Sequence, residues 1–296
     1  MGDYVDRGIH GFEIATYLIL LKLVHPTHFT VLRGNHEVAW MNRSFFLEEC
    51  RLKFGRQVGQ HVWRLLNAAF CQLPYAALIN GAVFVVHGGI PKNLRSLADL
   101  DQEIPKGLID EHYNRIALQL LWNDFRTADY DRRRLFVAGD VEQMEATAKE
   151  VNGLPNDGTL KTNGQGTEEE DEASIERYFV PNSVRNIGFI AGHKAVRHFL
   201  RRHGLSYIVR AHQYDGTVKA TGYNTHSAKK VLTVFSNSAY VGQLNSTACV
   251  CVNSATHSID IIGLRSGRRN PRREVGGRNH SEIFECDELA EMKFGF

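Results

Sequence analysis

The first eight residues, Met1-Gly-Asp-Tyr-Val-Asp-Arg-Gly8, hold side chains that could do chemistry on a phosphate. An aspartate at a strand end can bind a metal ion, and a second aspartate can orient a catalytic group. Arg7 can hold a phosphate through two parallel hydrogen bonds. Because such short patterns also occur in ordinary surface loops, this segment gains weight only from the rest of the chain.

Further polar clusters follow apolar segments, and they are GNHE (34–37), HGG (87–89), RAHQ (210–213) and FSNSAY (235–240). A lone histidine after a strand is usually a capping or surface residue. Together, however, Asp3, Asn35, His87 and His212 supply a carboxylate oxygen, an amide oxygen and two imidazoles. Mn, Fe and Zn accept this mixture of ligands. The joint pattern therefore predicts a divalent metal site.

The segments between these clusters predict an α/β fold. Helices are expected at 13–24, 45–69 and 192–202, and strands at 29–32, 205–209, 231–235 and 249–262. A hairpin is expected over 76–86 with its turn at Asn80-Gly81. In such folds ligands bind where strands end, which is where the polar clusters lie.

Composition sets the remaining limits. The chain has 296 residues with 43% hydrophobic content, which suits one large domain or two small ones. A net charge of +2 gives no case for nucleic acid or membrane as partners, and no apolar run could span a membrane. Five scattered cysteines indicate a reduced intracellular protein, so a cytoplasmic or nuclear location is expected. We expect a flexible insertion at about 151–178 and an arginine-rich, then acidic, mobile tail at 264–296.

As a set, GDYVDRG, LRGNHE, VHGG, LLWND, RAHQ and a variant of FSAPNY resemble the motifs of the metal-dependent serine/threonine phosphoprotein phosphatases, the family that includes calcineurin. The resemblance covers residues 2–262 apart from the insertion. It implies a metallophosphoesterase fold over residues 1–263, with a central β-sandwich of two mixed sheets flanked by helices. It also implies phosphorylated proteins as substrates and raises a regulatory subunit as a partner.

The resemblance further implies a role for each matching residue. Two divalent ions (Mn, Fe or Zn) would share Asp3 and activate a hydroxide that attacks phosphorus. His36 would protonate the leaving oxygen while Asp6 orients its ring. Arg210 is as readily structural as functional. The other implied residues are Asn35, His87 and His212 for the second metal, Arg7, Arg185, Asn35 and Tyr240 for the phosphate, and Asp124 at the site rim.

The chain departs from the family pattern at its start. The family has an earlier strand ending in G-D-x-H-G, which supplies an Asp and a His to the first metal, and no such segment occurs here. We therefore expect either an N-terminally incomplete chain lacking the first strand or a short protein with an impaired site. Two other functions stay open, a pseudophosphatase scaffold and a phosphoesterase acting on small phosphoesters. LLWND, RAHQ and FSNSAY favour the protein phosphatase over the latter.

Overall fold

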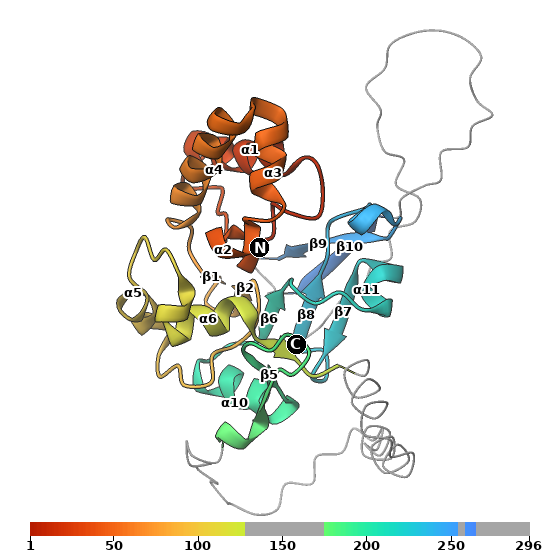
Figure 1. The fold of residues 1–296 in the computed structure, drawn as a ribbon. Coiled ribbons are helices and arrows are strands. Elements are labelled where there is room, and N and C mark those ends of the chain that lie inside the picture. Colours follow the sequence, from red (N-terminus) through yellow and green to blue (C-terminus); the bar gives the residue numbers. More distant parts are fainter. Residues whose placement is uncertain (128–174, 254–257, 265–296) are drawn as a thin grey trace, which may run out of the picture.

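The computed structural model describes residues 1–127, 175–253 and 258–264 (Figure 1). The expected insertion up to residue 174 and the expected tail from residue 265 lie outside these residues. Within the described part, no helix is both long enough and apolar enough to cross a membrane.

Four helices at the start of the chain form a group beside the sheets (Figure 1). They are α1 (Gly11–Val24), α2 (Ala39–Asn42), α3 (Phe46–Phe54) and α4 (Arg56–Phe70). Ala15 of α1, Phe46 of α3 and Phe70 of α4 are fully buried in one small core. Gly55, with φ of 80°, separates α3 from α4. The predicted helices at 13–24 and 45–69 are thereby confirmed.

A five-stranded mixed sheet forms the centre of the molecule, in the order β1-β2-β6-β8-β7. β2, β6 and β8 run parallel, while β1 and β7 are antiparallel to their neighbours. Asn80 and Gly81 both have positive φ, which confirms the predicted hairpin turn. The strands are β1 (Ala76–Ile79), β2 (Val83–Val86), β6 (Tyr207–Arg210), β7 (Tyr223–His226) and β8 (Val231–Val234).

Two smaller sheets complete the fold. One contains β3 (Asp124–Phe125), β5 (Phe189–Ala191) and β4 (Phe179–Pro181), and is also mixed. The other is the antiparallel pair β9 (Thr247–Val252) and β10 (Ile259–Leu264). The α/β class with mixed sheets and flanking helices is confirmed. The described strands, however, form three sheets where two were expected.

The central sheet separates two cores because alternate side chains of a strand point to opposite faces. Phe84 of β2 packs in the larger core, which also contains Leu120 of α6 (Arg115–Trp122) and Phe199 of α10 (His193–Arg202). Val85 packs in the other core together with Ile261 of β10. The other α-helices in the described ranges are α5 (Leu100–Glu103) and α11 (Gly216–Thr221).

The predicted strand at 29–32 is wrong, because this segment forms no ladder with a strand among the described residues. Its last carbonyl, that of Leu32, accepts a hydrogen bond from the Tyr4 hydroxyl at 2.9 Å. The next N–H, that of Arg33, donates to the carbonyl of Pro74 at 2.8 Å. Leu32 is buried as predicted, but the Leu32 carbonyl is paired with a side chain and the Arg33 N–H with a loop.

Candidate active site

Two loops distant in sequence cross at a pair of glycines, and this crossing positions Asp3. A Cβ on Gly2 would lie 2.4 Å from Cα of Gly34, so only glycine allows the backbones to approach this closely. The Glu37 carboxylate fastens the crossing by accepting the N–H groups of Asp3 and Tyr4 at 2.7 Å and of Gly34 at 2.9 Å. Asp3 is therefore held beside the GNHE segment.

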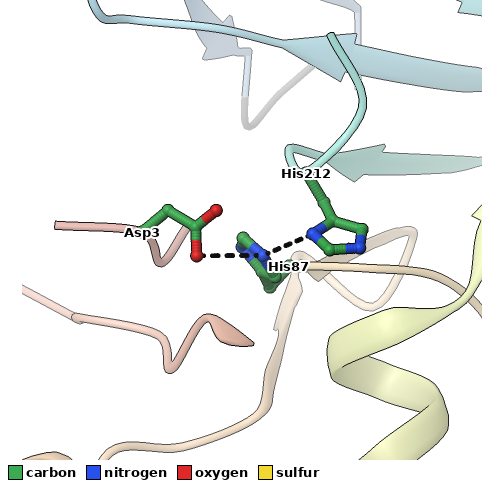
Figure 2. A group of neighbouring side chains, drawn as sticks. All are labelled: Asp3, His87 and His212. Carbon is green, nitrogen blue, oxygen red and sulfur yellow. Dashed lines mark hydrogen bonds and ion pairs between the residues drawn. The ribbon is translucent and has the colours of Figure 1, made fainter. Parts of the chain in front are cut away.

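All four predicted metal ligands come together, and Figure 2 shows three of them, Asp3, His87 and His212. Asp3, His87 and His212 each present a ligand atom, and these atoms lie within 4.8 Å of one another. Nε2 of His87 is the central atom, 2.9 Å from Oδ1 of Asn35, 3.1 Å from Nδ1 of His212 and 3.3 Å from Oδ1 of Asp3. His87 follows β2 and His212 follows β6, so adjacent parallel strands deliver the two imidazoles.

The protonation of His87 shows that this cluster suits a cation. Nδ1 of His87 lies 2.7 Å from the backbone carbonyl of Met1. A carbonyl can only accept, so Nδ1 carries the proton and Nε2 presents a lone pair. That lone pair faces the oxygens of Asn35 and Asp3, which are also acceptors, so no hydrogen bond can form between them. A divalent cation would satisfy all of these acceptors at once.

The pKa values of the cluster agree with this assignment. Burial lowers the pKa of His87 to about 4. Burial, together with the positive charge of Arg185, lowers the pKa of His212 well below its ordinary value. Burial alone would raise the pKa of Asp3, but the neighbouring histidines and Arg7 lower it overall. At neutral pH the site therefore offers a carboxylate and two neutral imidazoles, the forms that bind metals.

His36 and Asp6 form a buried pair next to the metal ligands. Nδ1 of His36 lies 2.6 Å from Oδ2 of Asp6. The other oxygen of Asp6 accepts the N–H of Phe46 at 2.9 Å, at the first residue of α3. Burial lowers the pKa of His36, but Asp3 and Asp6 outweigh it and the net shift is upward. His36 can therefore keep its proton and donate it from Nε2.

A cavity of about 330 Å³ is lined by three of the four residues expected to hold phosphate, Arg7, Arg185 and Tyr240, and by His212. The fourth, Asn35, is not part of its lining and contacts His87 in the metal cluster. Arg7 donates to the hydroxyl of Tyr240, and its guanidinium lies 5.7 Å from the ring centroid. Nη2 of Arg185 donates to the carbonyl of His212 at 2.9 Å. His212 thus belongs both to the metal cluster and to this arginine-lined cavity.

Asp124 lines the same cavity but is nearly buried, with 6% of its surface exposed. It accepts hydrogen bonds from Nε of Arg185 at 2.6 Å, Nδ2 of Asn182 at 2.8 Å and Nη2 of Arg210 at 3.2 Å. The sequence placed Asp124 at the rim, whereas the structure makes it the anchor of two arginines. It also lies 3.9 Å from Nε2 of His212, a buried nitrogen with no hydrogen-bond partner among the described residues.

Arg210 has a structural role. Its guanidinium is fully buried and donates to the carbonyls of Gly88 at 2.6 Å and Asn123 at 3.1 Å, as well as to Asp124. Burial lowers its pKa to about 10. Arg210 therefore joins the loop after β2 to the start of β3, and sets the position of the loop that carries His212.

Sequence reasoning did not assign a role to Glu37, the last residue of GNHE. It is fully buried and joins the two loops that carry Asp3 and Asn35. Burial and the charge of Asp3 raise its pKa to about 7. The signal available in the sequence was the GNHE motif itself, in which a carboxylate directly follows two expected site residues. A carboxylate is costly to bury unless it is hydrogen-bonded.

Comparisons with known proteins agree with this geometry. A family model described as calcineurin-like phosphoesterase matches residues 1–215. Two Saccharomyces cerevisiae proteins, serine/threonine-protein phosphatase 2B catalytic subunits A2 and A1, are 32% and 34% identical over 266 and 263 residues. A probable serine/threonine-protein phosphatase of Encephalitozoon cuniculi is 29% identical over 262 residues.

These matches cover 84% of this chain for both yeast proteins and 88% for the third, but only 38% and 45% of the relatives themselves. The chain thus spans less than half the length of these curated relatives.

A solved structure shares the fold. It is a Saccharomyces cerevisiae serine/threonine phosphatase with similarity to human phosphatase PP5, with a TM-score of 0.63 at 24% identity. The match covers 91% of this chain and 70% of that one. The resemblance drawn from the motifs is confirmed, and with it the implication of divalent metal ions as cofactors. Because the family model matches most of its residues, this chain belongs to the calcineurin-like phosphoesterase family.

Proposed function

We propose that this chain hydrolyses phosphoserine and phosphothreonine in proteins. The observation that carries the proposal is the position of His212, which joins a cluster of metal-binding atoms to an arginine-lined cavity. The buried pair of His36 and Asp6 lies beside the same cluster, since the backbone N–H of His36 donates to Oδ1 of Asp3 at 3.2 Å. The relatives are named as serine/threonine-protein phosphatases, which supports the same reaction.

In this mechanism the residues of the chain divide the work. Asp3, Asn35, His87 and His212 would hold a divalent cation, with Asp3 shared by a second one. When bound, such ions supply positive charge at the phosphate and a water of lowered pKa as nucleophile. The guanidinium groups in the cavity neutralise the phosphate oxygens, where charge is greatest in the transition state.

His36 completes the reaction by protonating the oxygen of the departing serine or threonine. An alkoxide is a poor leaving group, so the proton must arrive as the P–O bond breaks. Asp6 accepts a hydrogen bond from Nδ1 of His36 and so fixes the ring, which leaves the proton on Nε2 as the one to be donated. Arg185 is held by Asp124, which fixes one side of the phosphate cavity before substrate binds.

Several finer points belong to the proposal. The ions would be Mn, Fe or Zn, the metals that accept this mixture of oxygen and imidazole ligands. Asp3 and three further ligands account for one ion, and we propose that the other relies on ligands besides these. Phosphorylated proteins would be the substrates, and a regulatory subunit a partner. A cytoplasmic or nuclear location is also proposed, and imaging of the tagged protein in its own cells would test it.

The test is manganese-dependent release of phosphate from a phosphothreonine peptide. Because the chain spans under half the length of its relatives, the assay should include any longer form that the gene encodes. We expect turnover, and a loss of at least about a hundredfold in His87→Gln. The exposed histidine His61 on α4 gives a matched control, and His61→Gln should keep the wild-type rate.

Other outcomes would point elsewhere. Hydrolysis of dinucleotide polyphosphates without hydrolysis of the peptide would replace the proposal with a small-phosphoester activity. Binding of the phosphopeptide without turnover in any form of the protein would indicate a pseudophosphatase.

A further inference from the structure

A second cavity, of about 670 Å³, lies among helices α2, α3 and α4 and takes no part in the chemistry described above. Its lining includes two tryptophans and three arginines. The aromatic members are Trp40 and Trp63, and the charged ones are Arg43, Arg51 and Arg64, opposed by Glu48. We call this group the Arg–Trp pocket. Its excess of positive charge favours an anionic ligand.

Much of this positive charge is available for a ligand. Nη1 of Arg51 donates to Glu48 at 2.6 Å, but its buried Nε has no hydrogen-bond partner among the described residues. Arg43 and Arg64 are exposed, and neither forms an ion pair within the part of the chain that the structure describes. Guanidinium groups of this kind bind phosphate through two parallel hydrogen bonds.

The tryptophans give the pocket fixed walls. The Trp40 indole N–H donates to Glu111 at 3.2 Å, and its ring stacks on Trp122 with centroids 5.6 Å apart. Even so, 43% of Trp40 remains exposed. The Trp63 indole N–H donates to Oδ1 of Asn42 at 2.7 Å. Both rings are therefore held in place before any ligand arrives.

Asn42 places the Arg–Trp pocket next to the catalytic histidine. Its Nδ2 donates to the backbone carbonyl of His36 at 2.9 Å, while its Oδ1 accepts from Trp63. One buried side chain thus separates the backbone of His36 from the pocket wall. In the proposed reaction His36 protonates the leaving serine or threonine, so the substrate polypeptide must lie on the His36 side. The cavity lined by Arg7 and Arg185 takes the phosphate being removed.

We propose that the Arg–Trp pocket binds a second phosphorylated residue of the same substrate polypeptide. This inference rests on the proposed phosphatase function and adds a substrate class to it, namely proteins phosphorylated at two nearby positions. An extended chain spans roughly 3.3 Å per residue, so the distance between the two sites sets the spacing of the two phosphates along the peptide. The second phosphate would be held by Arg43 and Arg64, with the intervening chain against Trp40.

The test compares two peptides that share one phosphothreonine, one of which carries a second phosphoserine at spacings scanned along the chain. At the best spacing we expect kcat/KM to be at least about tenfold higher for the doubly phosphorylated peptide, as for one charge-assisted hydrogen bond. In Arg43→Gln/Arg64→Gln this ratio should fall to about one. Arg56→Gln is the control, since Arg56 is an exposed arginine of α4 outside the pocket.

The possible failures are distinguishable. Equal kcat/KM for both peptides at every spacing, or a preference that survives in the double variant, would overturn the pocket but leave the phosphatase function standing. If no peptide is hydrolysed, the phosphatase function fails, and the pocket is then judged by binding of a fluorescent doubly phosphorylated peptide. Equal affinity of wild type and double variant would overturn it. Displacement of that peptide by ATP, with ATP binding lost in the double variant, would replace it with a nucleotide site.

Discussion

Replacing Asp6 by asparagine should make His36, the proposed acid, a much weaker proton donor while leaving its surroundings in place. The side chain has the same shape, and its remaining oxygen can still accept the N–H of Phe46 at the start of α3. Its new amide group then faces Nδ1 of His36 and must donate to it. His36 becomes a neutral imidazole whose only proton is on Nε2, and a neutral imidazole is a far weaker acid than an imidazolium.

The size of the effect follows from what the acid supplies. General acid catalysis contributes about 10²–10⁴ in rate, so we expect kcat for a phosphothreonine peptide to fall at least about a hundredfold at neutral pH. Asp6 helps to raise the pKa of His36, so its loss lowers that pKa. The pH at which the rate declines on the alkaline side should therefore move to lower values in Asp6→Asn.

The free energy of unfolding should also depend on the His36–Asp6 pair, and the direction of its pH dependence can be worked out. The folded protein holds the His36 proton more tightly than the unfolded chain, whose histidines titrate near about 6.5. The pair thus stabilises the fold fully below that pH, and its contribution is lost as pH rises through the pKa of folded His36. Without added metal, the difference in free energy of unfolding between wild type and Asp6→Asn should be largest in acid and shrink as pH rises.

The decisive assay varies the leaving group. A nitrophenolate departs readily without a proton, so p-nitrophenyl phosphate should be affected far less by Asp6→Asn than the phosphothreonine peptide. His36→Asn should show the same selectivity, and the double variant should be no slower than His36→Asn alone, because Asp6 acts through His36. Equal losses on both substrates, or additive losses in the double variant, would refute the assignment of His36 as acid.

Two further predictions concern residues that hold the site together. Glu37→Gln should lower the free energy of unfolding by about 1–3 kcal/mol, because one of three backbone N–H groups would face an amide N–H. Calorimetry should also show about tenfold weaker Mn²⁺ binding. Unchanged Mn²⁺ binding would contradict the role of Glu37 in positioning the metal ligands. Arg210→Lys should lower the free energy of unfolding, measured in urea, by about 3 kcal/mol, since lysine cannot reach Gly88, Asn123 and Asp124 together. An unchanged urea midpoint would show that these contacts are dispensable.

The meeting of the two histidine ligands, His87 and His212, was predictable because it follows from strand order. Polar residues at the ends of adjacent parallel strands must come together at one edge of a sheet. β2 and β6 are such neighbours, with Val85 opposite Val209. The N–H of Ala211 donates to the carbonyl of His87 at 3.1 Å, which continues the alignment past the strand ends. His87 and His212 are side by side for this reason.

What could not be predicted depends on long-range partners of single groups. Residues 29–32 have the composition of a strand, but a strand exists only where a second one pairs with it. Nothing in the sequence shows that the hydroxyl of Tyr4 occupies the carbonyl of Leu32. The family resemblance likewise implied only a rim position for Asp124. Its burial depends on Arg185 and Arg210, whose convergence on one carboxylate is a property of the folded chain.

The same limit applies to the histidines, whose separate roles come from their partners. His36 has a carboxylate 2.6 Å away, and its pKa is raised. His87 has a backbone carbonyl on the equivalent nitrogen, which fixes the tautomer but adds no full charge, and burial lowers its pKa to about 4. One site can therefore contain a protonated acid and unprotonated ligands at the same pH. Activity should begin as pH rises past about 4, where His87 can bind a cation, and decline as pH passes the raised pKa of His36.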